Sequence, residues 1–168
     1  MSYDVSWDKP HTPSGSEFWQ ESDCYWFYDR KQGLGGFHRI GQKPAKGTGQ
    51  VTLFVFKEGG ERFVMSAGDG TEQDLNADAR QESKQAVGTH SAEALGEGRM
   101  RYVWSEDQCA GDVEFYECFH LPRDWSKSGH SDDFMSNINA DGHLECSGRL
   151  RGSIRIGDES FDIDALCH

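Results

Sequence analysis

The sequence lacks a long hydrophobic run and an excess of basic residues. No stretch approaches the roughly 20 apolar residues of a membrane-spanning helix. Residues 1–13 have neither the basic n-region nor the apolar h-region of a secretion signal. Acidic residues outnumber basic ones by 29 to 17, for a net charge of -12, whereas nucleic-acid binders cluster Lys and Arg. We therefore expect a cytoplasmic protein with no membrane span and no nucleic-acid partner.

Paired cysteines are also missing. The five cysteines are an odd number, and none forms a C-x-x-C pair. Without a secretion signal, this pattern favours free thiols over a disulfide framework. Because the paired spacing of zinc ligands is absent too, we expect no metal site.

Helical periodicity is nearly absent, and alternation of apolar and polar residues recurs instead, which is typical of β-strands. The expected strands cover residues 24–30, 34–42, 50–57, 62–68, 99–104, 112–120, 144–156 and 161–166, with a short helix around 77–86. A chain of 168 residues suits one domain. The prediction is an all-β, antiparallel domain over residues 1–168, folded as a lipocalin-like barrel or a strongly curved β-sandwich.

A glycine cluster at residues 33–36 raises the question of a phosphate-binding loop. Such a loop needs Gly-Lys-Ser/Thr or G-x-G-x-x-G at the start of a helix. Here the chain continues as Phe37-His38-Arg39-Ile40, which alternates as a strand. We therefore interpret the cluster as a turn between two strands.

Aromatic residues make up 12% of the sequence and concentrate on the expected strands. Any one of them can simply fill a β-core. However, the strand at 24–30 is aromatic on both faces, which indicates either two cores or a core and a lined cavity. The candidate ligand-binding residues are Trp26, Tyr28, Tyr102, Trp104 and Tyr116.

Four residues are candidates for acid-base catalysis. Asp29 and His38 flank the glycine turn and could approach each other across a hairpin. Glu114 and His120 share one strand face with Tyr116 and Cys118. If that face borders a cavity, the pKa values of Glu114 and His120 could shift; if it faces water, it is a solvated sheet face that pairs with Arg149, Arg151 or Arg155 across strands.

Two segments carry a family resemblance. Trp19 and Glu21, the run YWFYD at 25–29 and GLGGFHRIGQKP resemble the N-terminal half of lipocalin-like proteins related to carotenoid hydratase, or hydroxyneurosporene synthase. The segment GHLECSGRLRGSIRIGDESFDIDALCH is similar to the same group. The resemblance implies two consecutive lipocalin-like units, and this chain corresponds to the first, either as the N-terminal part of a longer protein or as a lone domain whose second unit lies elsewhere. It also implies enzymes that add water to isoprenoid-like substrates or reorganise them.

Two functions follow as expectations. In the first, the domain binds a small, largely apolar molecule, isoprenoid-like or aromatic, in a β-barrel cavity. Hydratase (hydro-lyase) or isomerase chemistry there needs no metal or cofactor, because acid-base catalysis suffices. In the second, it is a non-catalytic interaction domain that packs against a second lipocalin-like unit, a partner chain or another copy of itself.

Overall fold

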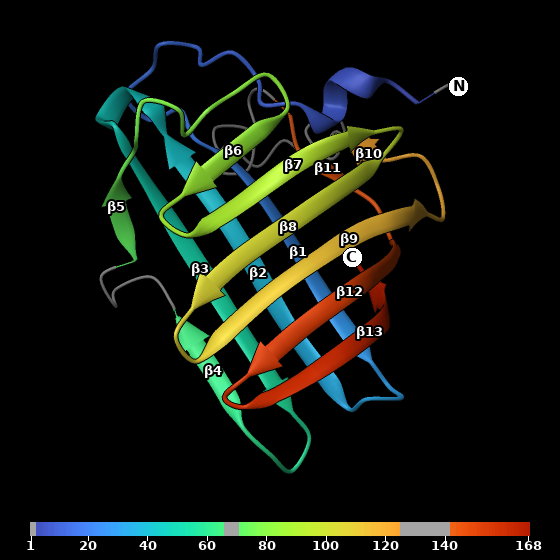
Figure 1. Cartoon of the computed structure of the whole chain (residues 1–168). Helices are drawn as coiled ribbons and strands as arrows, with labels where there is room; N and C mark the ends of the chain where they lie inside the picture. Colours follow the sequence, from blue (N-terminus) through green and yellow to red (C-terminus); the bar gives the residue numbers. More distant parts are fainter. Residues whose placement is uncertain (1–2, 66–70, 125–141) are drawn as a thin grey trace, which may run out of the picture.

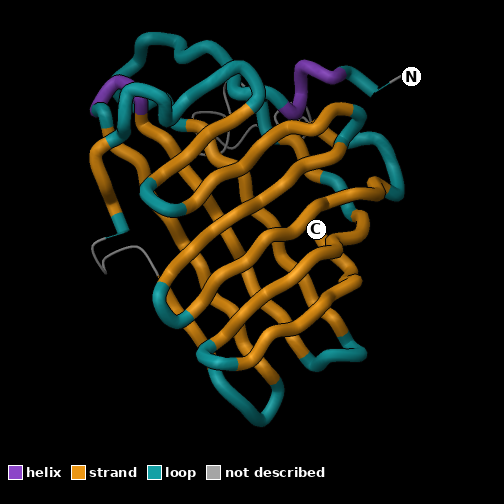
Figure 2. Tube along the Cα trace, viewed as in Figure 1, coloured by secondary structure: helices purple, strands orange, loops and turns teal. Residues whose placement is uncertain are grey.

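The computed structural model describes residues 3–65, 71–124 and 142–168, which are mostly β-strand (Figures 1 and 2). The strands are β1 (Glu21–Asp29), β2 (Leu34–Lys43), β3 (Thr48–Lys57), β4 (Arg62–Met65), β5 (Glu72–Asp74), β6 (Lys84–Val87), β7 (His90–Gly96), β8 (Arg99–Glu106), β9 (Cys109–Cys118), β10 (Arg123–Asp124), β11 (Leu144–Glu145), β12 (Gly148–Ile156) and β13 (Glu159–Cys167). Two short 3-10 helices are η1 (Val5–Asp8) and η2 (Pro44–Lys46). The all-β prediction is confirmed. None of the helices in the described ranges has the length and apolar character needed to cross a membrane.

One large antiparallel sheet contains most of the strands. Its order is β4-β3-β2-β1-β13-β12-β9-β8-β7-β6, with β5 also paired to β3, and β10 and β11 form a separate pair. Each half of the sheet is a meander of neighbouring strands. The two halves meet where β1 pairs with β13, through Phe27 with Cys167 and Tyr28 with Leu166.

The sheet curls into a half-barrel with two layers. In Figure 1, strands β1 to β4 run behind β6 to β9, β12 and β13 and cross them at a steep angle. Among the described strands, no backbone ladder joins the outer strands β4 and β6. Apolar side chains pack between the layers, and the largest fully buried ones include Trp104, Leu34, Ile40, Leu53, Leu150 and Ile154.

The turn predicted at the glycine cluster is confirmed. The glycine cluster ends the β1–β2 turn, with Gly33 at a φ of 60°. Its other glycines lie in β2 and give room to aromatic neighbours, because a Cβ at Gly35 would come within 2.7 Å of the Phe56 ring. The expected neighbouring strands also pair as the β3–β4 and β8–β9 hairpins. Residues 66–68 of the fourth expected strand lie outside the described residues.

The helix expected around residues 77–86 is wrong. This segment holds β6, which pairs with β7 through a turn at Gly88, where φ is 58°. The side-chain amide of Gln42 donates to the backbone oxygens of Ala79 and Ala86 at 2.7 and 3.0 Å. These tertiary hydrogen bonds and the β6–β7 ladder hold the segment in a non-helical conformation.

The expected strand at 144–156 is divided. Leu144 and Glu145 pair with β10, and the long strand starts only at Gly148. Its predicted alternation holds, because Leu150, Ile154 and Ile156 are buried. Glycine is required at Gly148, since a Cβ there would lie 2.0 Å from a backbone oxygen of β9.

Candidate functional site

The residues predicted for a site divide between the two faces of the curled sheet. The inner face holds Asp29, His38, Tyr102 and Trp104, all buried. The outer face holds Trp26, Tyr28, Glu114 and Tyr116, and His120 lies beyond the end of β9. Successive side chains of a strand point to opposite faces. Only the inner set can therefore surround a common interior site.

Asp29 and His38 do not meet. Asp29 pairs with Leu34 in the ladder, whereas His38 pairs with Tyr25 farther along the strands. The Asp29 carboxylate instead accepts hydrogen bonds from the backbone N–H groups of Lys31, Gln32 and Asp164, at 2.8, 3.0 and 3.0 Å. Asp29 thus holds the β1–β2 turn against β13, and the expected Asp-His pair across the hairpin is wrong.

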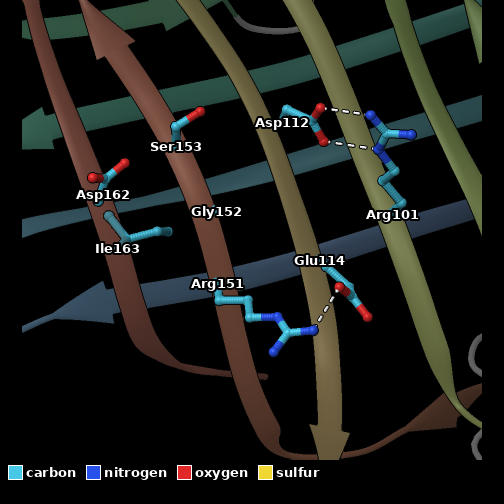
Figure 3. A pocket seen from close by; sticks show the side chains of 8 residues that line it. All are labelled: Arg101, Asp112, Glu114, Arg151, Gly152, Ser153, Asp162 and Ile163. Atoms are coloured by element: carbon cyan, nitrogen blue, oxygen red, sulfur yellow. Dashed lines mark hydrogen bonds and ion pairs between the residues drawn. The ribbon is translucent and has the colours of Figure 1, made fainter.

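Glu114 lies on the outer face among arginines (Figure 3). Its carboxylate accepts from Arg99 at 2.7 Å and from Arg151 at 3.1 Å. Burial raises the pKa of Glu114, but these hydrogen bonds outweigh it and the net shift is downward. Glu114 lines a surface hollow of about 560 Å³. Its charge is already neutralised by the protein, as the solvated-face alternative predicted.

Tyr116 and His120 are likewise bonded within the protein. The Tyr116 hydroxyl lies 3.1 Å from an Asp164 carboxylate oxygen and 2.9 Å from Arg149 Nε. His120 is exposed, and its Nδ1 lies 2.8 Å from the Leu121 carbonyl oxygen. Its Nε2 accepts from the backbone N–H of Ser147 at 3.2 Å. Both residues connect neighbouring chain segments outside the core.

Three polar side chains from different strands are linked by hydrogen bonds in the interior, and we call them the interior polar chain. His38 Nε2 on β2 lies 3.0 Å from His90 Nδ1 on β7. His90 Nε2 in turn lies 3.0 Å from a Glu106 carboxylate oxygen at the end of β8. Both histidines are 1% exposed, and the Glu106 side chain is 28% exposed. The chain leads from the centre of the half-barrel toward solvent.

The inner end of this chain has an unpartnered atom. His38 Nδ1 and the Tyr25 hydroxyl are buried, and neither has a hydrogen-bond partner. The two rings make an edge contact with centroids 5.6 Å apart. Burial, and to a lesser extent His90, lower the pKa of His38 to about 3. His38 is therefore a neutral imidazole at neutral pH.

Further aromatic rings pack against the Tyr25 and His38 rings. Tyr102 lies 4.4 Å from Tyr25, centroid to centroid, and Trp104 lies 5.1 Å from His38. The structure thus brings together His38, Tyr102 and Trp104 from the predicted set. Burial also raises the pKa values of Tyr25 and Tyr102, so that both phenols stay protonated.

Sequence reasoning missed Tyr25, His90 and Glu106. Tyr25 stands in the aromatic run, but it points to the opposite face from the candidates Trp26 and Tyr28. His90 lies outside the expected strands, and Glu106 lies two residues beyond the end of the expected strand at 99–104. A β-hairpin centred on Gly88 and Thr89 was the available signal, because it would have placed His90 at the start of a strand.

A second feature lies on the opposite side of the sheet. We define the outer aromatic face as Trp26, Tyr28, Phe37, Phe54 and Phe56, which come from β1, β2 and β3. Trp26 is 53% exposed, and its ring lies 4.3 Å from Phe37 and 5.7 Å from Phe54, centroid to centroid. Exposed Val64 pairs with Phe54, and exposed Leu166 with Tyr28, which extends the apolar surface.

The described residues contain no group of three or more His, Cys, Asp or Glu side chains placed to hold a metal ion. Among sequence families, the one described as a domain of unknown function, DUF7064, matches residues 4–168. The chain belongs to the DUF7064 family. The DUF7064 match includes every described strand, and it therefore covers both the interior polar chain and the outer aromatic face. No curated protein and no solved structure matches the sequence.

Proposed function

We propose that this domain binds a small, largely apolar molecule between the two layers of its half-barrel. The observation that carries the proposal is the pair of unpartnered polar atoms, Tyr25 Oη and His38 Nδ1, on buried side chains that pack against aromatic rings. A buried polar group without a partner destabilises a fold by roughly 1–3 kcal/mol. Native proteins almost always satisfy such groups, so a bound molecule with one polar group is the expected partner.

The chemistry that fits this site is hydratase or isomerase chemistry without a cofactor. Its support is the resemblance of YWFYD and the late GRLRGSIRI strand to carotenoid hydratase-related proteins. Of the residues first considered for catalysis, only His38 borders the proposed site. Glu114 and His120 lie outside it, and Asp29 is occupied by three backbone N–H groups.

A titration with N-phenyl-1-naphthylamine, a neutral apolar fluorophore, tests the proposal. We expect saturable uptake by the intact protein. Ala92→Leu should abolish it, because Ala92 is buried on the inner face of β7, where it pairs with Tyr102. Trp26→Ser, on the outer face, should leave uptake unchanged.

Circular dichroism must first show that both variants are folded. The absence of saturable uptake by the intact protein would contradict interior binding. Loss of uptake in Trp26→Ser alone would move the binding site to the outer aromatic face. Mass spectrometry of the purified protein would then identify a retained natural ligand.

The outer aromatic face supports a second candidate function, that of an interaction domain. Monomeric proteins rarely expose a contiguous apolar patch of several large side chains unless it binds something. In this function, the face packs against a second lipocalin-like unit or a partner chain. A second copy of this chain is the simplest occupant.

Sedimentation velocity over a range of protein concentrations tests self-association. If a second copy binds, we expect a concentration-dependent dimer that Trp26→Ser removes. Phe119→Ser is the matched control, because Phe119 is 52% exposed but stands apart from the face, beyond the end of β9. A monomer at all concentrations, or equal loss in both variants, would exclude the second copy as occupant.

A further inference from the structure

The hydrogen bonds of the interior polar chain determine which ring nitrogen of each histidine carries the proton. Glu106 ends the chain with a carboxylate, and an ionised carboxylate can only accept hydrogen bonds. His90 therefore donates from Nε2 to Glu106 and has a free lone pair on Nδ1. That lone pair must accept from the Nε2–H of His38. By elimination, His38 Nδ1 carries no proton, and it has no donor in the structure.

His38 Nδ1 is consequently a fixed acceptor. A neutral imidazole in water exchanges between two tautomers, but here the bond to His90 selects one of them. The position of His38 is also fixed, because it is 1% exposed and its ring contacts Tyr25, Tyr102 and Trp104. The acceptor lone pair is thus oriented before any ligand arrives.

Tyr25 supplies the complementary donor. Its hydroxyl is buried and unpartnered, and its ring makes a T-shaped contact with the His38 ring. A group that satisfies both atoms must donate one hydrogen bond and accept another. A hydroxyl does both, whereas an ether or a ketone only accepts and an ammonium only donates.

We propose that His38 and Tyr25 recognise the hydroxyl group of a neutral, largely apolar alcohol, with His90 and Glu106 as the residues that hold His38 in its acceptor tautomer. The inference rests on the proposed interior binding and names the class of ligand. A carboxylate is disfavoured, because it would face the His38 lone pair and no cationic side chain among the described contacts of this pair compensates its charge. Among neutral apolar molecules, the site selects alcohols.

Isothermal titration calorimetry with three matched probes tests this selectivity. The probes are 1-naphthalenemethanol, its methyl ether and 1-naphthoate, which share one ring system. We expect the alcohol to bind roughly tenfold or more tightly than the ether, because the ether leaves His38 Nδ1 unpaired. The carboxylate should bind more weakly than either.

Variants assign the preference to particular atoms. His38→Phe removes the acceptor, so the ratio of alcohol to ether affinity should fall to near one. Tyr25→Phe removes only the donor, which should weaken alcohol and ether alike. Glu106→Ala removes the acceptor for His90 Nε2–H and should reduce the ratio while the protein stays folded, since Glu106 is partly exposed.

Three outcomes would overturn the inference. Equal affinities for alcohol and ether would show interior binding without hydroxyl recognition, as when a water molecule satisfies both atoms. An unchanged ratio in His38→Phe would place recognition elsewhere. Absence of binding by all three probes would instead count against the proposed interior binding itself. If His38→Phe does not fold, the Glu106→Ala ratio decides the question.

Discussion

At the scale of single residues, the buried His38 makes the stability of the fold depend on pH. Its pKa in the folded protein is about 3, against an ordinary value near 6.5. Between these values the unfolded chain binds a proton at His38 that the folded protein does not. The contribution of His38 to the free energy of unfolding is therefore fully present above about pH 6.5, and it decreases as the pH falls toward 3.

Replacing His38 should flatten the pH dependence of stability. Between about pH 7.5 and about pH 5, we expect the intact protein to lose on the order of 2 kcal/mol more than His38→Phe. Urea unfolding at both pH values measures the difference. Asp23 opposes this trend in both proteins, because burial raises its pKa to about 6 and it gains stability as the pH falls below that value. An identical loss in both proteins would contradict a buried neutral His38.

At the scale of elements, alternation and turn residues were enough to predict most strands. Strands β2, β3 and β8 begin and end close to the expected residues. The failures lie where tertiary contacts decide the local structure. The hydrogen bonds from Gln42 hold residues 79–86 in place. A local sequence pattern cannot predict a hydrogen-bond partner so far away in the sequence.

The candidate site was harder to predict for a related reason. The alternation within β1 is plain, but the sequence does not say which set of aromatics faces inward. Both Tyr25 and Trp26 are aromatic, and only the curl of the sheet buries one and exposes the other. The histidine pair unites β2 with β7, which share no backbone ladder.

Within the β8–β9 hairpin, Gly111 is required for packing. Gly111 pairs with Trp104, and a Cβ at this position would lie 2.2 Å from the indole ring. Trp104 is 1% exposed and cannot move aside without disturbing the core. We expect Gly111→Ala to lower the free energy of unfolding by roughly 1–3 kcal/mol, as overpacking usually does.

Urea denaturation measures this effect. Ser105→Ala is the control, because Ser105 is exposed and adjacent to Trp104 in the sequence. The control should unfold at the midpoint of the unmodified protein. An unchanged midpoint for Gly111→Ala would show that the indole ring has room to shift.

At the scale of the whole molecule, side chains rather than backbone ladders hold the open side of the half-barrel together. Gln42 on β2 reaches the backbone of residues 79 and 86, and it accepts from Arg80 at 3.0 Å. His38 makes the corresponding bond to His90. We therefore expect Gln42→Leu to loosen β6 without unfolding the sheet, because it removes the side-chain donor from the backbone oxygen of Ala86 and one of the two donors to that of Ala79.

Hydrogen exchange detected by mass spectrometry resolves this loosening. In Gln42→Leu, amides of β6 and β7 should exchange faster, whereas those of β12, paired on both sides by β9 and β13, should keep their protection. Equal acceleration in every strand would indicate global destabilisation instead. Unchanged exchange in β6 would show that the β6–β7 ladder alone holds this edge.

The pairing of β1 with β13 has a consequence for how the molecule assembles. Each meander can form from neighbours in the sequence, but the two can join only when strands from opposite parts of the chain meet. Such non-local pairing is slow, because the entropy of closing a long loop is lost before any contact compensates for it. On the ribosome, β13 also emerges after every strand that it helps to organise. Until it arrives, the edge of β1 beside the exposed Trp26 and Tyr28 rings is open to other chains, and this interval is when the protein is most vulnerable to aggregation.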